Sequence, residues 1–442
     1  MKVYRAIGIL APLILAAVLA GGQSRGATNV SAEFSSMPAS CSPAPCVLPP
    51  TQATQGQYFF DAPAVADPAN PAHLIVGSQS VNCFQGGLGF WVSTNAGSTW
   101  SQTCMSPLTY EGNEYVPDSG PILGYDRIGN AYIAGLYGYD GSGDPEPGLL
   151  AFQKYTPDGG WSAPAVAVID KGEPFYPRFC WLAVDTNAAS PYVDSVYISC
   201  VMTPFQSGSR FQVVVSHSND GGVSWHQVDV APVQNYPDVD SYTAMAVGKD
   251  GTVYVTWQYC NMNFCEDTGS TAYMVFSKSS DGGSTWSKPR LVAPVTGINP
   301  LPNTDISVAN LPAIAVDNSD GPHTGCLYVV MYNWTGTFMQ VQVVRSTDGG
   351  GTWSKPVPVA PGITHDQFFP WISVSPTGLV GVSWMDRRND PANIDYQAFA
   401  AISSDGGRSF QPNVQLTTAF SNPNNTGPVS YTHLTLPTTP YV

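Results

Sequence analysis

The sequence predicts an all-β protein built from repeated, four-stranded antiparallel units. Three observations predict this fold class: one eight-residue pattern recurs along the chain, short runs of alternating apolar and polar residues accompany each copy, and these runs lack helical periodicity. The composition agrees, because 43 glycines and 39 prolines among 442 residues favour tight turns, and 12% aromatic residues favour strands.

The recurring pattern is clearest in "SSDGGSTW", residues 279–286. Its six copies begin at residues 93, 155, 218, 279, 346 and 403, so neighbouring copies lie 57 to 67 residues apart. This period is too long for a helical solenoid and leaves room for four strands with generous loops.

Each repeat has the same internal order. A first strand of small residues ends near an aspartate, as in "LAVD" (182–185), and an alternating second strand follows, as in "TVYVTW" (252–257). A third strand, such as "YMVFSKS" (273–279), leads into the octet, and a fourth, such as "KPRLVAP" (288–294), leaves it. We therefore expect a β-propeller with six visible four-stranded antiparallel blades, and we leave open a seventh blade lost from the C-terminal end.

The octet is expected at the hairpin between the third and fourth strands of each blade. Ser279 and Asp281 can accept hydrogen bonds from N–H groups that the tight turn leaves unpaired. Gly282 or Gly283 can adopt the positive φ that the turn needs. Trp286 would fold back into the apolar interior of its blade.

The pattern S-x-D-x-G-x-T-W is the Asp box, and residues 60–428 resemble the sialidase-like, BNR-repeat β-propeller family. Asp boxes also occur in xyloglucan-cleaving glycosidases, sortilin-type receptors and photosystem assembly factors, so the resemblance is specific for architecture and not for chemistry. It implies that the octet aspartates hold the blades together and do not act on substrates. These aspartates are Asp158, Asp220, Asp281, Asp348 and Asp405.

Both ends of the chain are expected to lie outside the propeller, which we place at residues 57–428. Residues 1–20 have the basic start and apolar stretch of a secretion signal, and the stretch is shorter than the roughly 20 residues of a membrane span. Residues 21–56, rich in Ser, Pro and Thr, would form a flexible leader. Residues 429–442 contain "VSYTHLTLPT", which matches a translated sequencing-library adapter better than an ordinary Thr/Pro-rich tail.

Charge and cysteine content restrict the partners. A net charge of −15 repels phosphate backbones, which argues against nucleic acid. We expect a secreted or periplasmic monomer without a membrane span in its mature form, with an extracellular glycan or glycoconjugate as its partner. No cofactor is required, although the acidic surface would suit a structural calcium ion. Nine cysteines in an exported chain indicate disulfides. The expected pairs are Cys41–Cys46, Cys83–Cys104, Cys180–Cys200 and Cys260–Cys265, which leaves Cys326 unpaired.

Comparing the blades with one another reveals where their sequences stop agreeing. At the start of the first strand only the third blade carries a charge, Arg178. At the end of the second strand only the sixth blade is charged, in "WMDRRND" (384–390). One interpretation is a surface salt-bridge cluster, with Asp386 paired to Arg387 and Asp390 to Arg388, which would stabilise little. The other is a cationic site for a carboxylate-bearing sugar.

The second interpretation supplies a set of candidate site residues on one face of the ring. Sialidases use a tyrosine nucleophile paired with a glutamate and an aspartate acid/base, and most other glycosidases use two carboxyls. The candidate catalytic residues are Asp240, Tyr242, Asp366 and Asp386. The candidate substrate-binding residues are Arg178, Arg387, Arg388 and His365.

The chain departs from the sialidase pattern at one point. Residues 31–100 contain no arginine, so the Phe-Arg-Ile-Pro motif that precedes the first Asp box in sialidases is missing. Two functions therefore remain: a glycoside hydrolase or other glycan-active protein, or a non-catalytic propeller that binds carbohydrate or protein at the cell surface. Two carboxyls about 5–10 Å apart in one cleft would favour the enzyme.

Overall fold

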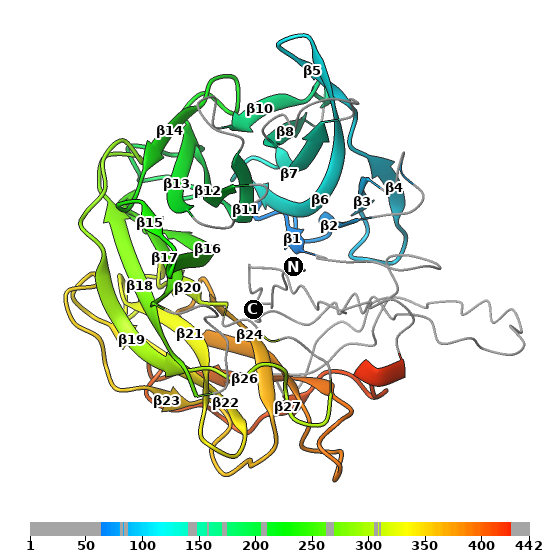
Figure 1. Cartoon of the computed structure of the whole chain (residues 1–442). Helices are drawn as coiled ribbons and strands as arrows, with labels where there is room; N and C mark the ends of the chain where they lie inside the picture. Colours follow the sequence, from blue (N-terminus) through cyan, green and yellow to red (C-terminus); the bar gives the residue numbers. More distant parts are fainter. Residues whose placement is uncertain are drawn as a thin grey trace, which may run out of the picture.

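The computed structural model describes residues 63–79, 83, 87–139, 148–156, 159–169, 175–204, 210–261, 269–304, 308 and 311–425. These residues form strands β1 to β27 and one short 3-10 helix, η2 (Pro423–Asn425). The strands make six antiparallel sheets that stand around a common axis (Figure 1). The predicted six-bladed, all-β propeller is confirmed.

Each blade is built from consecutive strands of the chain. The first of its four main strands lies innermost, nearest the axis of the ring. Blade one contains β1 (Ala64–Ala66), β2 (Leu74–Gln79), β3 (Leu88–Ser93) and β4 (Ser101–Cys104). Blade two contains β6 (Asn113–Tyr125), β7 (Ala131–Tyr139), β8 (Leu149–Thr156) and β10 (Ala165–Val168), with β5 (Leu108–Tyr110) and β9 (Gly160–Trp161) added. Blade three contains β11 (Phe175–Val184), β12 (Val196–Pro204), β13 (Arg210–Ser218) and β14 (His226–Asp229), with β15 (Gln234–Asn235) added.

The remaining blades are regular four-stranded sheets. Blade four contains β16 (Asp238–Val247), β17 (Val253–Asn261), β18 (Thr271–Ser279) and β19 (Arg290–Thr296). Blade five contains β20 (Ala313–Val316), β21 (Leu327–Trp334), β22 (Met339–Ser346) and β23 (Val357–Pro358). Blade six contains β24 (Gln367–Val374), β25 (Val380–Asp386), β26 (Gln397–Ser403) and β27 (Val414–Gln415).

The octets form the hairpins between third and fourth strands. In blade four the Asp281 carboxylate accepts hydrogen bonds from Ser279 Oγ (2.7 Å) and from Thr285 N (2.9 Å). Ser279 Oγ in turn accepts one from Gly283 N (2.9 Å), and Trp286 Nε1 donates to Gly283 O (3.1 Å). The same bonds recur at the aspartates of three other blades, namely Asp220, Asp348 and Asp405. Asp158 lies outside the described residues.

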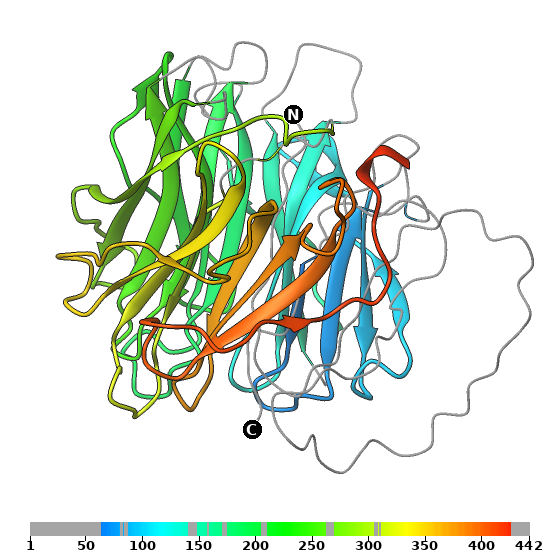
Figure 2. The same cartoon turned by 90° about the horizontal axis from the view of Figure 1, so that it is seen from below.

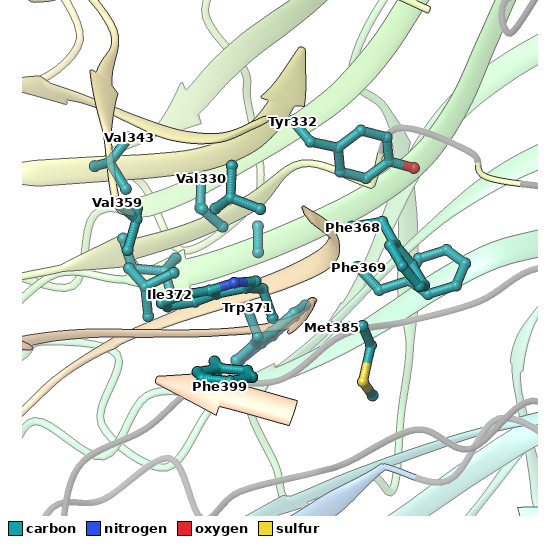
Figure 3. Packing of buried hydrophobic residues seen from close by; sticks show 14 of the residues in the cluster. Val330, Tyr332, Val343, Val359, Phe368, Phe369, Trp371, Ile372, Met385 and Phe399 are labelled. Atoms are coloured by element: carbon teal, nitrogen blue, oxygen red, sulfur yellow. The ribbon is translucent and has the colours of Figure 1, made fainter. Parts of the chain in front are cut away.

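Neighbouring blades pack face to face through apolar clusters. A cluster of buried residues lies between every two consecutive blades, from the first pair, blades one and two, to the last pair, blades five and six. Figure 3 shows part of the cluster between the last two blades, where Trp371 and Ile372 meet Val330 and Val359. Both faces of most sheets are therefore buried, and polar chemistry is left to the strand ends and loops, which lie above and below the blades (Figure 2).

Cations also link neighbouring blades on the octet face. Lys278 Nζ, one residue before the octet of blade four, donates to Gly349 O in the octet of blade five (2.8 Å). Arg345 Nη1 repeats this contact one blade later, with Gly406 O (3.3 Å). The octet face therefore holds the ring together.

The described cysteines agree with the predicted pairing. Disulfides join Cys83 to Cys104 and Cys180 to Cys200, with Cα atoms 5.6 and 4.1 Å apart, and Cys326 is buried and free. Cys260 is also disulfide-bonded, while its predicted partner Cys265 lies outside the described residues. The predictions for Cys41, Cys46, the secretion signal, the leader and the C-terminal tail fall outside them as well. Among the described residues, no helix has the length and apolar character to cross a membrane.

Candidate functional site

The innermost strands carry a repeated irregularity. In β6, β11, β16 and β24 the pairing register shifts, and a residue with positive φ lies in each shift. These residues are Gly120 (65°), Phe179 (55°), Tyr242 (56°) and Phe369 (48°). Side chains other than glycine are strained in this region by about 1 kcal/mol or more, so surrounding contacts must hold the three aromatic residues there.

One such contact crosses between blades three and four. Thr243 Oγ1 donates to the carbonyl oxygen of the strained Phe179 (2.7 Å), and Ser199 Oγ donates to Thr243 Oγ1 (2.8 Å). The rings of Phe179 and Tyr242 then lie 4.4 Å apart. The two residues with positive φ, Phe179 and Tyr242, therefore place their rings against each other between blades three and four.

The same aromatic residues fill the centre of the ring. The ring centroids of Trp181 in blade three and Trp371 in blade six lie 4.5 Å apart, so these two blades meet across the axis. A small cavity of about 10 Å³ remains among Phe179, Trp181, Tyr242, Thr243, Ala244, Leu311, Pro312 and Trp371. That volume holds roughly one water molecule, so a sugar cannot enter the cavity itself.

Polar chemistry gathers on one side of blade four instead. Asp238 and Asp240 stand two residues apart on β16, opposite Asn261 and Tyr259 of β17, respectively. Trp257 of β17 lies beside them, at the register shift of β16. Trp257 Nε1 donates to Asp240 Oδ1 (2.9 Å), and Tyr259 Oη donates to Asp238 Oδ1 (3.0 Å). Asn261 Nδ2 also donates to Asp238. We call these five residues the blade-four ladder.

Asp240 has an unusual environment for a carboxyl group. Asp240 is 1% exposed, and among the residues that the structure describes its Oδ2 has no hydrogen-bond partner. Burial raises the pKa of Asp240 from its ordinary value of 3.8 to about 7; the Trp257 hydrogen bond opposes this shift, and the negative charge of Asp238 adds to it. Burial therefore favours the protonated form of Asp240.

The outer end of the ladder is open to solvent and aromatic. Asp238 and Tyr259 are half-buried and Asn261 is exposed. Tyr259 pairs with Tyr273 on the neighbouring strand β18, with ring centroids 6.2 Å apart. Tyr236, two residues before β16, is 50% exposed. Carboxyl, amide and aromatic groups of this kind suit the hydroxyls and apolar faces of sugars.

Arg178 lies at a different place, on β11 of blade three. It is half-buried, and it forms no ion pair among the residues that the structure describes. Its nearest polar neighbours include Tyr176: burial and the charge of Asp118 raise the pKa of Tyr176, and Arg178 acts in the opposite direction. Arg178 thus remains a candidate for binding an anionic group.

Arg387, predicted to bind substrate, lies in a buried ion pair of blade six. Arg387 and Asp366 are both 0% exposed and form an ion pair of 3.1 Å, Nη1 to Oδ2. Arg387 also donates to Pro302 O (3.1 Å) and Thr304 Oγ1 (3.2 Å), and Asp366 accepts from Asn393 Nδ2 (2.7 Å). Arg387 and Asp366 therefore hold each other and anchor loops of blades five and six.

Arg388 and Asp386, also predicted as site residues, form a second ion pair in blade six. Arg388 Nη2 contacts Asp386 Oδ2 at 2.6 Å, and Trp384 Nε1 donates to the same oxygen (2.7 Å). The guanidinium lies 4.2 Å from the ring centroid of Phe399, and Nη1 donates to Asn413 Oδ1 (2.9 Å). The salt-bridge interpretation is thus closer to the structure, but the pairs are Asp366–Arg387 and Asp386–Arg388 rather than those predicted.

The other candidates lie apart from one another. Tyr242 is buried beside the central cavity, and His365 is half-buried in the loop before β24. The expected cationic depression shared by Arg178, Arg387 and Arg388 is therefore not formed. The blade-four ladder contains one predicted catalytic residue, Asp240.

Sequence reasoning missed how Asp238, Asn261 and Tyr273 combine with Asp240. Asp238 and Tyr259 stand two residues from Asp240 and Trp257, respectively, which would place each pair on one face of its strand. That alternation was the available signal. The choice of partner across the sheet requires the strand register, which the sequence does not specify.

Comparison with protein-family models and with curated proteins finds no match for this sequence. Solved structures do match. An ulvan lyase, described as a new family of polysaccharide lyase, is 15% identical, with a TM-score of 0.50 over 84% of this chain and 88% of that chain. An intramolecular trans-sialidase from Ruminococcus gnavus is 12% identical, with a TM-score of 0.47 over 76% and 91%. A Hadza microbial sialidase is 14% identical, with a TM-score of 0.44 over 74% and 69%. At these identities the likeness concerns the propeller fold alone.

Proposed function

We propose that this protein is a secreted glycoside hydrolase that acts on extracellular glycans at the blade-four ladder. The observation that carries the proposal is the Asp240 carboxyl, which is buried, has one free oxygen and has a pKa raised to about 7. A carboxylic acid that keeps its proton near neutral pH is what a general acid requires.

Asp238 supplies the second carboxyl group of the proposed pair. Residues two apart on a strand are separated by roughly 7 Å along its axis, which lies in the range of about 6.5–9.5 Å that leaves room for a water molecule between two catalytic carboxyls. Asp240 would protonate the glycosidic oxygen as the C–O bond breaks. Asp238 would take a proton from the water that attacks the anomeric carbon, so the product would have inverted stereochemistry.

Location outside the cell is supported by the disulfides. Cys83–Cys104 and Cys180–Cys200 are bridges of a kind that persists in oxidising compartments. Arg178 completes the proposal as a binding residue for an anionic group of the glycan, since it has no carboxylate partner among the described residues.

The full chain, Asp240→Asn and Asp250→Asn should be incubated with a panel of polysaccharides, and new reducing ends should be measured. Asp250 is an exposed residue of the hairpin at the opposite end of blade four and serves as the matched control. Asp240→Asn should lose about 100-fold or more of the activity, Asp250→Asn should keep it, and NMR of the first product should show inversion. Full activity in Asp240→Asn, or cleavage of no glycan, would contradict the proposal.

A non-catalytic, glycan-binding propeller is the second candidate. The observation that favours it is the 1% exposure of Asp240, which limits contact with a glycosidic oxygen. Binding of a glycan without release of reducing ends, unchanged in Asp240→Asn, would support this candidate.

A further inference from the structure

We infer that the site takes an extended oligosaccharide chain, whose sugar rings lie along an aromatic strip that runs outward from Asp238 across blade four. The strip consists of Tyr259, Tyr273, Pro294 and Leu291. The inference rests on the proposed function and specifies its substrate: a chain of several sugars rather than one terminal sugar.

The strand register places the strip in one line. Tyr259 of β17 is opposite Tyr273 of β18, and Tyr273 is opposite Pro294 of β19. Leu291 joins from the next row, opposite Val275. Residues opposite each other in an antiparallel sheet share a face, so these side chains follow one another from the inner to the outer strands of the blade.

Exposure increases along the line. Tyr259 and Tyr273 are half-buried, Pro294 is exposed, and Leu291 is 55% exposed, one of the few large apolar side chains on the described surface with this much exposure. Nothing in the packing of blade four requires Leu291 to face solvent, since the neighbouring Val292 and Ala293 supply the buried contacts of β19.

The chemistry of the strip favours a glycan over a protein partner. Its inner end carries hydrogen-bonding groups, namely the Asp238 carboxyl, the Asn261 amide and the Tyr259 hydroxyl. Its outer part is apolar and consists of only Pro294 and Leu291. A chain of sugars, with hydroxyls at the ring edges and apolar C–H faces, matches both properties, whereas a protein interface requires a broader patch.

The test measures binding without cleavage, in the Asp240→Asn background of the full chain. Neutral and anionic oligosaccharides of one to six sugars, immobilised as an array and then used free in calorimetry, serve as probes. The tightest chain of three or more sugars should bind about tenfold more tightly than its monosaccharide. Tyr273→Ala should remove that gain, and Tyr273→Phe, which keeps the ring, should retain it.

Equal affinity for chains and monosaccharides, or unchanged binding in Tyr273→Ala, would overturn the inference. So would selective capture of proteins with no oligosaccharide bound. The outcome is separable from that of the proposed function: cleavage without a chain-length effect refutes only the strip, and length-dependent binding that requires Tyr273 without cleavage refutes only the hydrolase.

Discussion

Blades four and six place a tryptophan at the same point of the second strand and use it differently. Trp257 in blade four and Trp384 in blade six both donate an indole N–H to a buried aspartate, Asp240 and Asp386 respectively. In blade six the aspartate also binds the Arg388 guanidinium at 2.6 Å. In blade four no cation contacts Asp240 among the described residues, and its pKa rises to about 7.

The difference teaches that burial alone does not decide what a carboxyl group does. A buried carboxylate with a cation and several donors is a stable, ionised part of the fold. A buried carboxyl with one donor and no cation tends to keep its proton, and such raised pKa values are concentrated at functional sites. The proposed site therefore lies in blade four, where the buried carboxyl of Asp240 has no cation among its described contacts.

The largest expected effect comes from removing a cation of blade six. Arg387→Met leaves Asp366 buried without its ion-pair partner and releases the loop that Arg387 holds through Pro302 and Thr304. We expect a loss of about 3–5 kcal/mol in the free energy of unfolding, measured by urea denaturation. A loss below 1 kcal/mol would show that blade six does not depend on this pair.

Asp240→Asn should change the pH dependence of stability. The folded-state pKa of Asp240 is raised from 3.8 to about 7, so the folded protein binds this proton more tightly than the unfolded chain does. The contribution of this proton to the free energy of unfolding is complete below about pH 4 and is lost as pH rises to about 7. The wild type loses this contribution and the variant does not. The free energy of unfolding of Asp240→Asn, relative to that of wild type, should therefore rise by roughly 4 kcal/mol between pH 4 and pH 8. A constant difference across this range would contradict the account.

Asp386→Asn is the matched change in blade six and should act in the opposite direction. It weakens a charge-assisted contact with Arg388 while keeping the shape of the side chain. We expect the free energy of unfolding to fall by about 1.5–3 kcal/mol at pH 8, measured by urea denaturation as for Asp240→Asn. If both asparagine variants were destabilised equally at pH 8, the distinction between the two blades would fail.

Asn261→Arg transfers the cation of blade six to blade four. Asn261 follows Trp257 by four residues, as Arg388 follows Trp384 in blade six. A guanidinium near Asp238 should favour the charged form of Asp240 and lower its pKa by about one unit, equivalent to roughly 1.4 kcal/mol. NMR titration of Asp240 in this variant measures the shift, and an unchanged midpoint would show that burial alone sets the pKa.

The sequence was sufficient for the fold because the octets repeat local information. Ser279 and Asp281 form their turn bonds within the octet itself, so their roles can be read without knowing the rest of the chain. The disulfide between Cys180 and Cys200 was equally predictable, since consecutive antiparallel strands bring the two residues together.

The candidate site was less predictable because its partners are set by the register and by the bulges. Arg387 pairs with Asp366, 21 residues away, and not with the acidic residues beside it in the sequence. In β16 the shift between Ser241 and Ala244 interrupts the alternation, so the burial of Asp240 cannot be deduced by counting from the strand's apolar end.

The most direct test of the central claim is the titration of Asp240 itself. The ¹³Cγ resonance of Asp240, assigned by its absence in Asp240→Asn, should be followed by NMR from pH 3 to pH 9 in the full chain. A midpoint near the value of about 7 would establish a protonated, uncompensated carboxyl in the blade-four ladder. A midpoint near its ordinary value of 3.8 would show that burial does not keep Asp240 protonated, and the proposed acid would be lost.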